Sequence, residues 1–294
     1  MSTFQHTGVA QKRSPFRKLA ALGFAAFLMV PTLVRAQVTL GPNLQSFGVL
    51  AGSTVTNTGA SVVTGNVGVS PGLAIVGFPP GTATGTLQSG GATPAQAQTE
   101  LTTAYNAAAG AVCNTVLTGI DLGGLTLVPG VYCFAAGAQL TGNVTLNFLG
   151  DPNAAFVFQI GSTLTTAAGS SVLAINAGGA GCLPNINWQV GTSATLGTTT
   201  QFAGNILADQ SITLTTGANL RGRALARIAA VTLDSNQNVG GCPAAAAFAG
   251  GPIPAPGAGT ITNVPTLQEW ALILLGFMLA GFGGWQVRRR AIAR

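Results

Sequence analysis

The dipeptide Thr-Leu returns along the second half of the chain at nearly constant intervals. The copies are Thr145-Leu146, Thr163-Leu164, Thr195-Leu196, Thr213-Leu214 and Thr232-Leu233. Only the interval between the second and third copies is long, and it contains residues 178–187, which we interpret as an insertion. A second series, Trp188, Ile206 and Leu225, keeps the same interval as the regular copies. A period of ~18–19 residues without helical periodicity is typical of one coil of a parallel β-solenoid.

Each repeat also alternates as a short strand does. In residues 211–215, Ile212 and Leu214 are predicted to point inward, with Ser and Thr between them pointing outward. Residues 50–69 follow the same pattern. Six glycines are expected at tight corners, where a positive φ is tolerated: Gly142, Gly161, Gly197, Gly204, Gly217 and Gly222.

One helix interrupts the repeats, at about residues 94–113. Thr93 is the predicted N-cap, Pro94 the first helical residue, and Gln96 would complete a capping box. A narrow apolar stripe at helical spacing predicts that this helix packs alongside the solenoid: Ala97, Leu101, Ala104, Ala108 and Val112.

The two ends of the chain have the patterns of targeting segments. Basic residues up to Lys18, an apolar run at 19–30 and the sequence Val34-Arg35-Ala36 predict a signal peptide over residues 1–36; an uncleaved anchor is the alternative. The domain proper is then 37–242, and residues 243–263 form a Pro/Ala/Gly linker. The tail, 264–294, contains an uncharged segment at 271–287 before three arginines, which predicts a helix in the inner membrane with the arginines cytoplasmic.

The net charge of +6 comes from the ends of the chain. Between residues 37 and 241 there are three basic and five acidic residues, a net charge of −2. The basic surface that nucleic-acid binding needs is therefore absent, and no nucleic-acid partner is expected.

Four cysteines in an exported chain favour disulfides: Cys113, Cys133, Cys182 and Cys242. Three pairings are possible, and we favour Cys113–Cys133 with Cys182–Cys242. A zinc site is the rival interpretation, but the chain has no histidine after His6 and no close Cys-x-x-Cys pair. We expect neither a metal nor any other cofactor.

Several segments resemble a known family, in the family's order over about residues 40–240. They are residues 48–59, 65–72, 121–132, 156–164 and 222–226. They are similar to the ice-binding proteins shared by bacteria, fungi and algae of cold habitats. The resemblance implies a mainly β fold: a discontinuous right-handed parallel β-solenoid of triangular section, with one long α-helix packed alongside.

The tail resembles the IPTL-type sorting tails of Gram-negative bacteria. The matching residues are Val264, where the family pattern has isoleucine, followed by Pro265, Thr266, Leu267, Glu269 and Trp270. The resemblance implies that the tail is held in a membrane and processed by an exosortase-like enzyme, leaving the protein secreted or on the cell surface.

The resemblance and the composition together predict ice, or ordered water, as the partner of a monomeric protein. Only 6% of residues are charged, and charged groups hold liquid water firmly. The outward threonines are the candidate ice-binding residues: Thr54, Thr56, Thr145, Thr163, Thr165, Thr195, Thr213, Thr215 and Thr232. A surface adhesin or matrix component that binds something other than ice is the alternative.

An enzyme is the third class of function considered, and we expect no catalytic residues. The five acids of the domain are scattered singly along the sequence, whereas glycoside hydrolysis needs paired carboxylates. Without a histidine in the domain, a Ser-His-Asp triad is also excluded.

Overall fold

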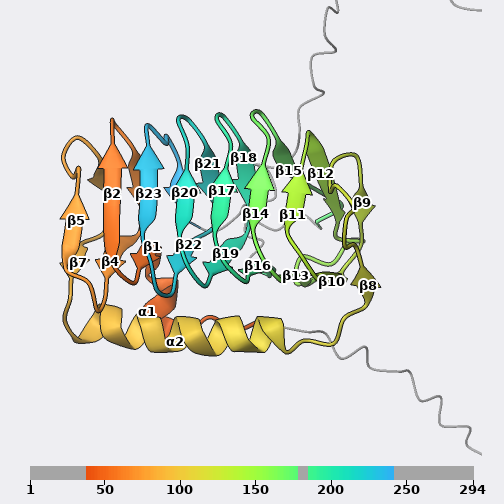
Figure 1. Cartoon of the computed structure of the whole chain (residues 1–294), viewed down its shortest axis with the longest axis horizontal. Helices are drawn as coiled ribbons and strands as arrows, with labels where there is room; N and C mark the ends of the chain where they lie inside the picture. The colour runs from red at the N-terminus through yellow and green to blue at the C-terminus, as the bar shows by residue number, and fades with distance from the viewer. Residues whose placement is uncertain (1–37, 178–184, 242–294) are drawn as a thin grey trace, which may run out of the picture. The chain divides into compact units, whose positions relative to one another are not determined.

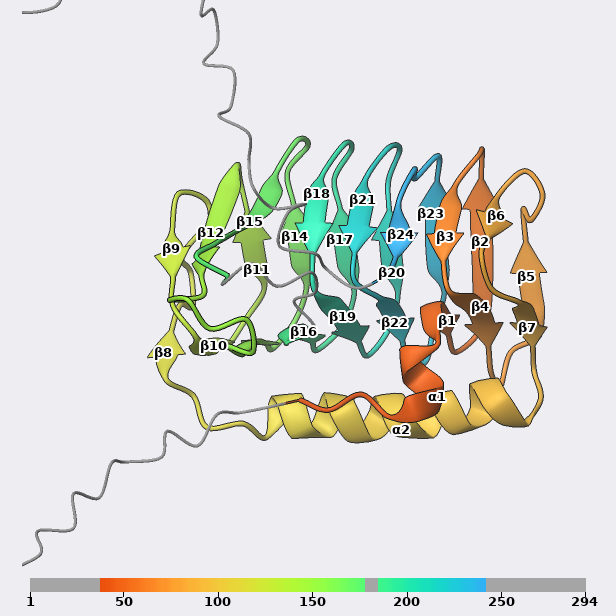
Figure 2. The same cartoon turned by 180° about the vertical axis from the view of Figure 1, so that it is seen from behind.

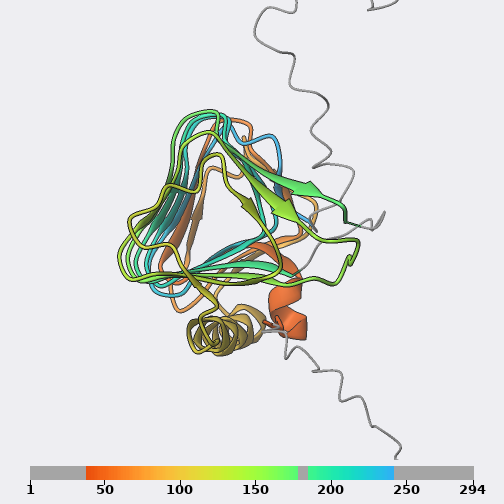
Figure 3. The ribbon, with the colours of Figure 1, turned by 90° about the vertical axis from the view of Figure 1, so that its right-hand side faces the viewer.

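The computed structural model describes residues 38–177 and 185–241, and these form a solenoid with three sides (Figures 1–3). Every strand pair is parallel, so each side is one parallel sheet. Seen along its axis, the solenoid has a triangular section, with the long helix outside one side (Figure 3). The predicted β-solenoid with one long helix alongside is confirmed.

The three sheets, called A, B and C below, each receive one strand from most coils. In spatial order, sheet A contains β7 (Leu87–Ser89), β4 (Asn66–Val69), β1 (Phe47–Ala51), β22 (Ala224–Ala226), β19 (Asn205–Ala208), β16 (Ile186–Val190), β13 (Phe156–Ile160), β10 (Gly130–Phe134) and β8 (Thr115–Val116). Sheet B contains β11 (Ala138–Leu140), β14 (Leu164–Thr166), β17 (Ala194–Leu196), β20 (Ile212–Leu214), β23 (Val231–Asp234), β2 (Thr54–Thr58) and β5 (Ala74–Val76). Sheet C contains β6 (Thr82–Ala83), β3 (Val62–Thr64), β24 (Val239–Gly240), β21 (Asn219–Arg221), β18 (Gln201–Ala203), β15 (Ser171–Ile175), β12 (Asn143–Asn147) and β9 (Thr126–Leu127).

The coils are not stacked in chain order, which makes the solenoid discontinuous. Strands β1 to β7 build one end, and the helix α2 (Ala92–Ala109) then carries the chain to the other end, where β8 begins (Figure 1). The later coils return toward the start, so that β22, β23 and β24 pair with β1, β2 and β3. The first and last coils therefore meet in the middle of the body.

The strand pairing corrects part of the predicted repeat. Thr145 lies on β12 of sheet C, whereas Thr163 immediately precedes β14 of sheet B, so the interval between them does not span one coil. On sheet B, Ala138 pairs with Leu164 and Leu164 with Ala194, which makes both of those steps longer than the predicted period. The later steps agree with the predicted period, because Leu196 pairs with Leu214 and Leu214 with Leu233.

The second series was also partly misaligned. Trp188 pairs with Ile206 as expected, but the next residue in that column is Ala224. Leu225 instead pairs with Leu207, and both pack in the cluster that includes the buried stripe of α2. A one-residue shift along a strand reverses the side to which a side chain points.

The helix begins earlier than predicted and ends earlier as well. Its N-cap is Gly91, with no side-chain cap, so the capping box predicted from Thr93 and Gln96 is wrong. The stripe formed by Ala97, Leu101, Ala104 and Ala108 is buried as expected, but Val112 lies beyond the end of the helix and is 82% exposed.

Polar contacts fix α2 at its C-terminal end and against the short helix α1 (Pro42–Gln45). The Gln159 side-chain amide donates to the carbonyl oxygen of Ala108 in the last turn of α2 at 2.9 Å and to that of Ala111, just beyond the helix, at 2.6 Å. The Glu100 carboxylate accepts from the Asn43 side chain and the Leu44 N–H, both at 2.8 Å. Desolvation opposes ionisation of Glu100, but these hydrogen bonds outweigh it and lower the pKa.

The structure contains a disulfide between Cys113 and Cys133, which ties the chain after α2 to β10. Cys182 and Cys242 lie outside the described residues, as do the predicted signal peptide, linker and sorting tail. Within residues 38–177 and 185–241, no helix is both long and apolar enough to span a membrane.

The corner glycines serve two different purposes. Gly142, Gly204, Gly217 and Gly222 have positive φ, as predicted. Gly161 and Gly197 do not have positive φ, so the prediction is wrong at these two positions; at Gly161, a Cβ would lie 2.6 Å from the Ala135 carbonyl oxygen of the neighbouring coil. A side chain at that position would therefore push two coils apart.

An aromatic stack crosses several coils inside the body. The ring of Trp188 lies parallel to that of Phe158 at 3.7 Å, and Phe158 stacks on Tyr132 at 5.5 Å. The Trp188 Nε1–H donates to the Ala203 carbonyl oxygen at 2.9 Å, so its one polar group is satisfied although the residue is fully buried. Such ring pairs add about 0.5–1.5 kcal/mol each beyond the burial of apolar area.

We predict that Trp188→Ala lowers the free energy of unfolding by about 3–5 kcal/mol, because it removes the centre of this stack and leaves a cavity. Urea unfolding followed by circular dichroism measures the change. The exposed substitution Thr165→Ala is the control and should shift the same free energy by less than about 0.5 kcal/mol. A similar small shift for Trp188→Ala would show that the stack contributes little.

Candidate functional site

The outer surfaces of the three sheets differ in what they present. Sheet A is covered by α2, with Leu207 and Leu225 beneath the helix (Figure 1). The outer surface of sheet C (Figure 2) includes larger polar and charged side chains, with Gln201 on β18 and both Asn219 and Arg221 on the neighbouring strand β21. In the part of the chain that the structure describes, no helix or strand lies over sheet B, which faces the viewer in Figure 1.

A continuous row of threonines runs across sheet B. In the order in which their strands pair, the five residues of this threonine row are Thr165, Thr195, Thr213, Thr232 and Thr56. The row continues to Gln139 on β11 at one end and to Val76 on β5 at the other. Each step is one strand, so neighbouring threonines are spaced by about 4.8 Å.

A second row lies two residues earlier on each coil and faces the same way. Its members, called the mixed row, are Thr163, Ser193, Ser211, Ala230 and Thr54. Alternate residues on a strand are separated by about 6.7 Å, so the two rows form a two-dimensional array of small side chains.

The threonine hydroxyl groups of the array are free to meet solvent, whereas the Ser193 hydroxyl accepts from the Ser211 N–H at 3.3 Å. Within the described residues, none of the seven threonine hydroxyls in the two rows makes a hydrogen bond to another protein group. Thr215 differs, because its hydroxyl donates to the Leu196 carbonyl oxygen at 2.8 Å. The threonines of the array therefore offer both a methyl group and an unused hydroxyl.

The packing beneath the array holds it rigid. Between the two rows, each strand turns one apolar side chain inward, and five of these are buried: Leu164, Ala194, Ile212, Val231 and Val55. Threonine is β-branched and has few rotamers at χ1, so its hydroxyl and methyl positions follow the backbone closely.

Eight of the nine predicted threonines lie on or beside the outer surface of sheet B, and seven of them belong to the array. Thr145 does not, since it lies on sheet C between Thr126 and Leu173. Thr215 follows β20 and uses its hydroxyl internally. Ser193 and Ser211 were not among the predicted residues, although Ser211 was expected to point outward and both serines lie two residues before a predicted threonine.

Charged groups lie at the margins of sheet B and outside both rows. Asp209 and Arg227 form an ion pair at 2.6 Å beyond the end of β19, and the Arg227 guanidinium stacks over Tyr105 of α2 at 4.5 Å. Asp234, at the end of β23, accepts hydrogen bonds from the hydroxyls of Thr216 and Ser235. The array itself is uncharged.

Asp121 lies beyond the β11 end of the sheet. Its Oδ1 accepts from the N–H groups of Gly123 at 2.7 Å and Thr141 at 2.9 Å. Desolvation works against ionisation, but these hydrogen bonds prevail and lower the pKa of Asp121 below its ordinary value. Among the described residues, no group of three or more His, Cys, Asp or Glu side chains could hold a metal ion.

Comparison with known proteins identifies the family. The model of the family described as ice-binding-like matches residues 49–239, which span all three sheets and α2. The chain belongs to the ice-binding-like family. The IPTL-CTERM motif matches residues 262–290, at the position predicted for the sorting tail.

Individual relatives of the ice-binding-like chain agree with this assignment. It is 54% identical over 223 residues to an ice-binding protein of Nostoc sp. (strain HG1), covering 75% of this chain and 81% of the relative. It is similar to the crystal structure of an ice-binding protein from an Antarctic biological consortium, with 49% identity, a TM-score of 0.66 and coverage of 70% and 92%. The structure from the ascomycete Antarctomyces psychrotrophicus has 40% identity, the same TM-score and coverage of 70% and 100%.

The two kinds of threonine hydroxyl predict different effects on stability. Thr215→Val should lower the free energy of unfolding by about 1 kcal/mol, because it removes an internal hydrogen bond. The Thr213 hydroxyl makes no internal hydrogen bond, and valine has nearly the same shape as threonine. Thr213→Val should therefore change the free energy of unfolding by less than about 0.5 kcal/mol. Equal losses in chemical denaturation would contradict the assignment of free and internally bonded hydroxyls.

Proposed function

We propose that this protein binds ice through the outer surface of sheet B. The observation that carries the proposal is the threonine row: five residues in register, one strand apart, whose hydroxyls make no hydrogen bond to any protein group among residues 38–177 and 185–241. The relatives named as ice-binding proteins support it.

The chemistry of the array suits an ordered water ligand. Spacings of about 4.8 Å along the row and 6.7 Å along a strand are comparable to repeats in the ice lattice. Hydroxyl groups can take the place of lattice water, while the methyl groups leave the water between them bonded mainly to other water. The rigid backbone keeps these positions fixed, so little conformational entropy is lost when ice forms against the surface.

No enzymatic role is part of the proposal. Asp209 is paired with Arg227, while Asp121 accepts hydrogen bonds from the backbone around it. These are the bonds of structural carboxylates. Membership in the ice-binding-like family favours a binding function as well.

The proposal includes export and attachment to the cell surface. The IPTL-CTERM match supports a sorting role for the tail and an exosortase-like processing enzyme as a partner. We propose residues 1–36 as a signal peptide, 37–242 as the body, 243–263 as the linker and 264–294 as the tail, with an inner-membrane segment at 271–287. A monomeric body released by processing would inhibit ice growth or recrystallisation, and a body kept at the surface of a Gram-negative cell would attach the cell to ice.

Adhesion to a sugar-bearing surface is less well supported. Sugar-binding grooves commonly use exposed aromatic rings, and among the described residues Trp and Tyr occur only at Tyr105, Tyr132 and Trp188. Tyr132 and Trp188 are buried in the aromatic stack, and Tyr105 lies against Arg227. None of these rings forms an open stacking platform.

We predict that Thr213→Tyr abolishes most of the thermal hysteresis and ice recrystallisation inhibition of the purified protein. Thr213 is central in the threonine row, and a ring there would hold ice away from its neighbours on both sides. Thermal hysteresis is measured at equal protein concentrations, with circular dichroism spectra to show that the fold is unchanged.

Thr145→Tyr is the matched control, because Thr145 is a partly exposed, mid-strand threonine on sheet C. It should retain full activity. If Thr145→Tyr loses activity and Thr213→Tyr keeps it, the ice-binding surface is on sheet C. Absence of activity in the parent protein would favour the adhesin alternative.

A further inference from the structure

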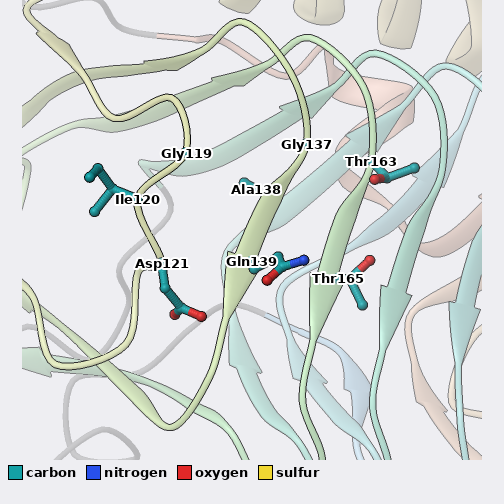
Figure 4. A pocket seen from close by; sticks show the side chains of 8 residues that line it. All are labelled: Gly119, Ile120, Asp121, Gly137, Ala138, Gln139, Thr163 and Thr165. Atoms are coloured by element: carbon teal, nitrogen blue, oxygen red, sulfur yellow. The ribbon is translucent and has the colours of Figure 1, made fainter.

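The β11 end of sheet B contains a hollow of about 370 Å³ that opens beside the threonine row (Figure 4). The loop 119–121 forms one wall, and strands β11 and β14 form the rest. Its polar side chains are those of Asp121, Gln139, Thr163 and Thr165. Two members of the array therefore border a polar depression, whereas the central members do not line it.

A missing side chain and a neighbouring loop explain why the depression is present. Position 137 would continue the mixed row, but it is glycine, and a Cβ there would lie 2.9 Å from the Thr163 hydroxyl. The adjacent loop is held along β11, since the Leu122 N–H donates to the Gln139 carbonyl oxygen at 2.9 Å. The surface is therefore lowered at Gly137 and bounded by the loop that carries Asp121.

The carboxylate of Asp121 is fixed in this position. Two backbone N–H groups hold its Oδ1, and these hydrogen bonds favour the ionised form. Removing the water that hydrates a charge is costly, much more so than removing water from a hydroxyl or a methyl group. Ice growing over the hollow would have to replace that hydration water.

The opposite end of the array differs in chemistry. There the threonine row ends at Val76 and the mixed row at Ala74, both on β5. Neither side chain carries charge or hydrogen-bonding groups, so ice contact at that end meets no comparable cost. The sheet is therefore asymmetric along its length.

We propose that Asp121 and Gln139 keep liquid water in this hollow and so set one limit of the ice-contacting area, leaving strands β17 to β2 as its main part. The proposal rests on ice binding by sheet B and names the residues that restrict it. Asp121 is in this sense a residue that determines the extent of the site.

Asp121→Asn tests the proposal in the full-length protein. Asparagine keeps an Oδ1 acceptor for the Gly123 and Thr141 N–H groups while removing the charge. Thermal hysteresis at neutral pH should rise above that of the unchanged protein. Gln139→Thr would extend the threonine row from five to six members and should also raise thermal hysteresis. It provides a second variant if Asp121→Asn does not fold.

Asp151→Asn is the matched control. Asp151 also accepts from the N–H two residues ahead, that of Asn153 at 2.9 Å, but it lies between β12 and β13, at the corner of sheets C and A. The same change of charge there should leave hysteresis unchanged. An increase shared by Asp121→Asn and Asp151→Asn would reflect net charge and overturn the proposal.

Hysteresis equal to that of the unchanged protein in folded Asp121→Asn would also overturn it. Thr213→Tyr, measured in parallel, separates the two levels of inference. If Thr213→Tyr loses activity while Asp121→Asn gains none, ice binding by sheet B is supported and the proposed boundary at the hollow is wrong. If Thr213→Tyr keeps full activity, the assignment of sheet B fails, and the limit fails with it.

Discussion

Parallel pairing of one coil on the next is the interaction on which the rest of this structure depends. Backbone hydrogen bonds fix neighbouring strands about 4.8 Å apart, and the side-chain alternation of a strand then determines what each sheet presents. Strand pairing alone places Thr195, Thr213 and Thr232 in register and so produces a regular row of threonines. The aromatic stack and the inward aliphatic residues hold that register from inside.

The order of the coils gives this pairing a second consequence. Thr56 and Thr232 are neighbours in the row although one comes from the first coils of the chain and the other from the last. The array is complete only when the last coils of the chain have closed onto the first, and α2 is the connection that allows it. The contacts of Gln159 and Arg227 with the helix therefore also support the outer surface of sheet B.

The sequence predicted the solenoid and most of the array because repetition and alternation are both visible in it. Thr195, Thr213 and Thr232 lie in coils without insertions, so the spacing in sequence equals the spacing in structure. Thr145 was misplaced because its interval from Thr163 matches the repeat period by coincidence, across a step from sheet C to sheet B. The coils that end at Leu164 and Ala194 are longer than the period, and their longer loops conceal the true partners.

Other features could not be predicted from local patterns. The pairing of β2 with β23 depends on closure of the whole body. The hollow at Gly137 depends on how a loop passes a neighbouring strand, and the internal use of the Thr215 hydroxyl depends on the coil beneath it. The helix N-terminus was misjudged because Gly91, and not the side chain of Thr93, occupies the cap.

Direct capture of the protein by ice tests the central claim most simply. An ice hemisphere is grown slowly from a dilute solution of the oxidised protein, and the concentrations in the ice and in the remaining liquid are compared. The account predicts enrichment in the ice relative to an inert protein of similar size. Exclusion from the ice to the same extent as that inert protein would contradict it.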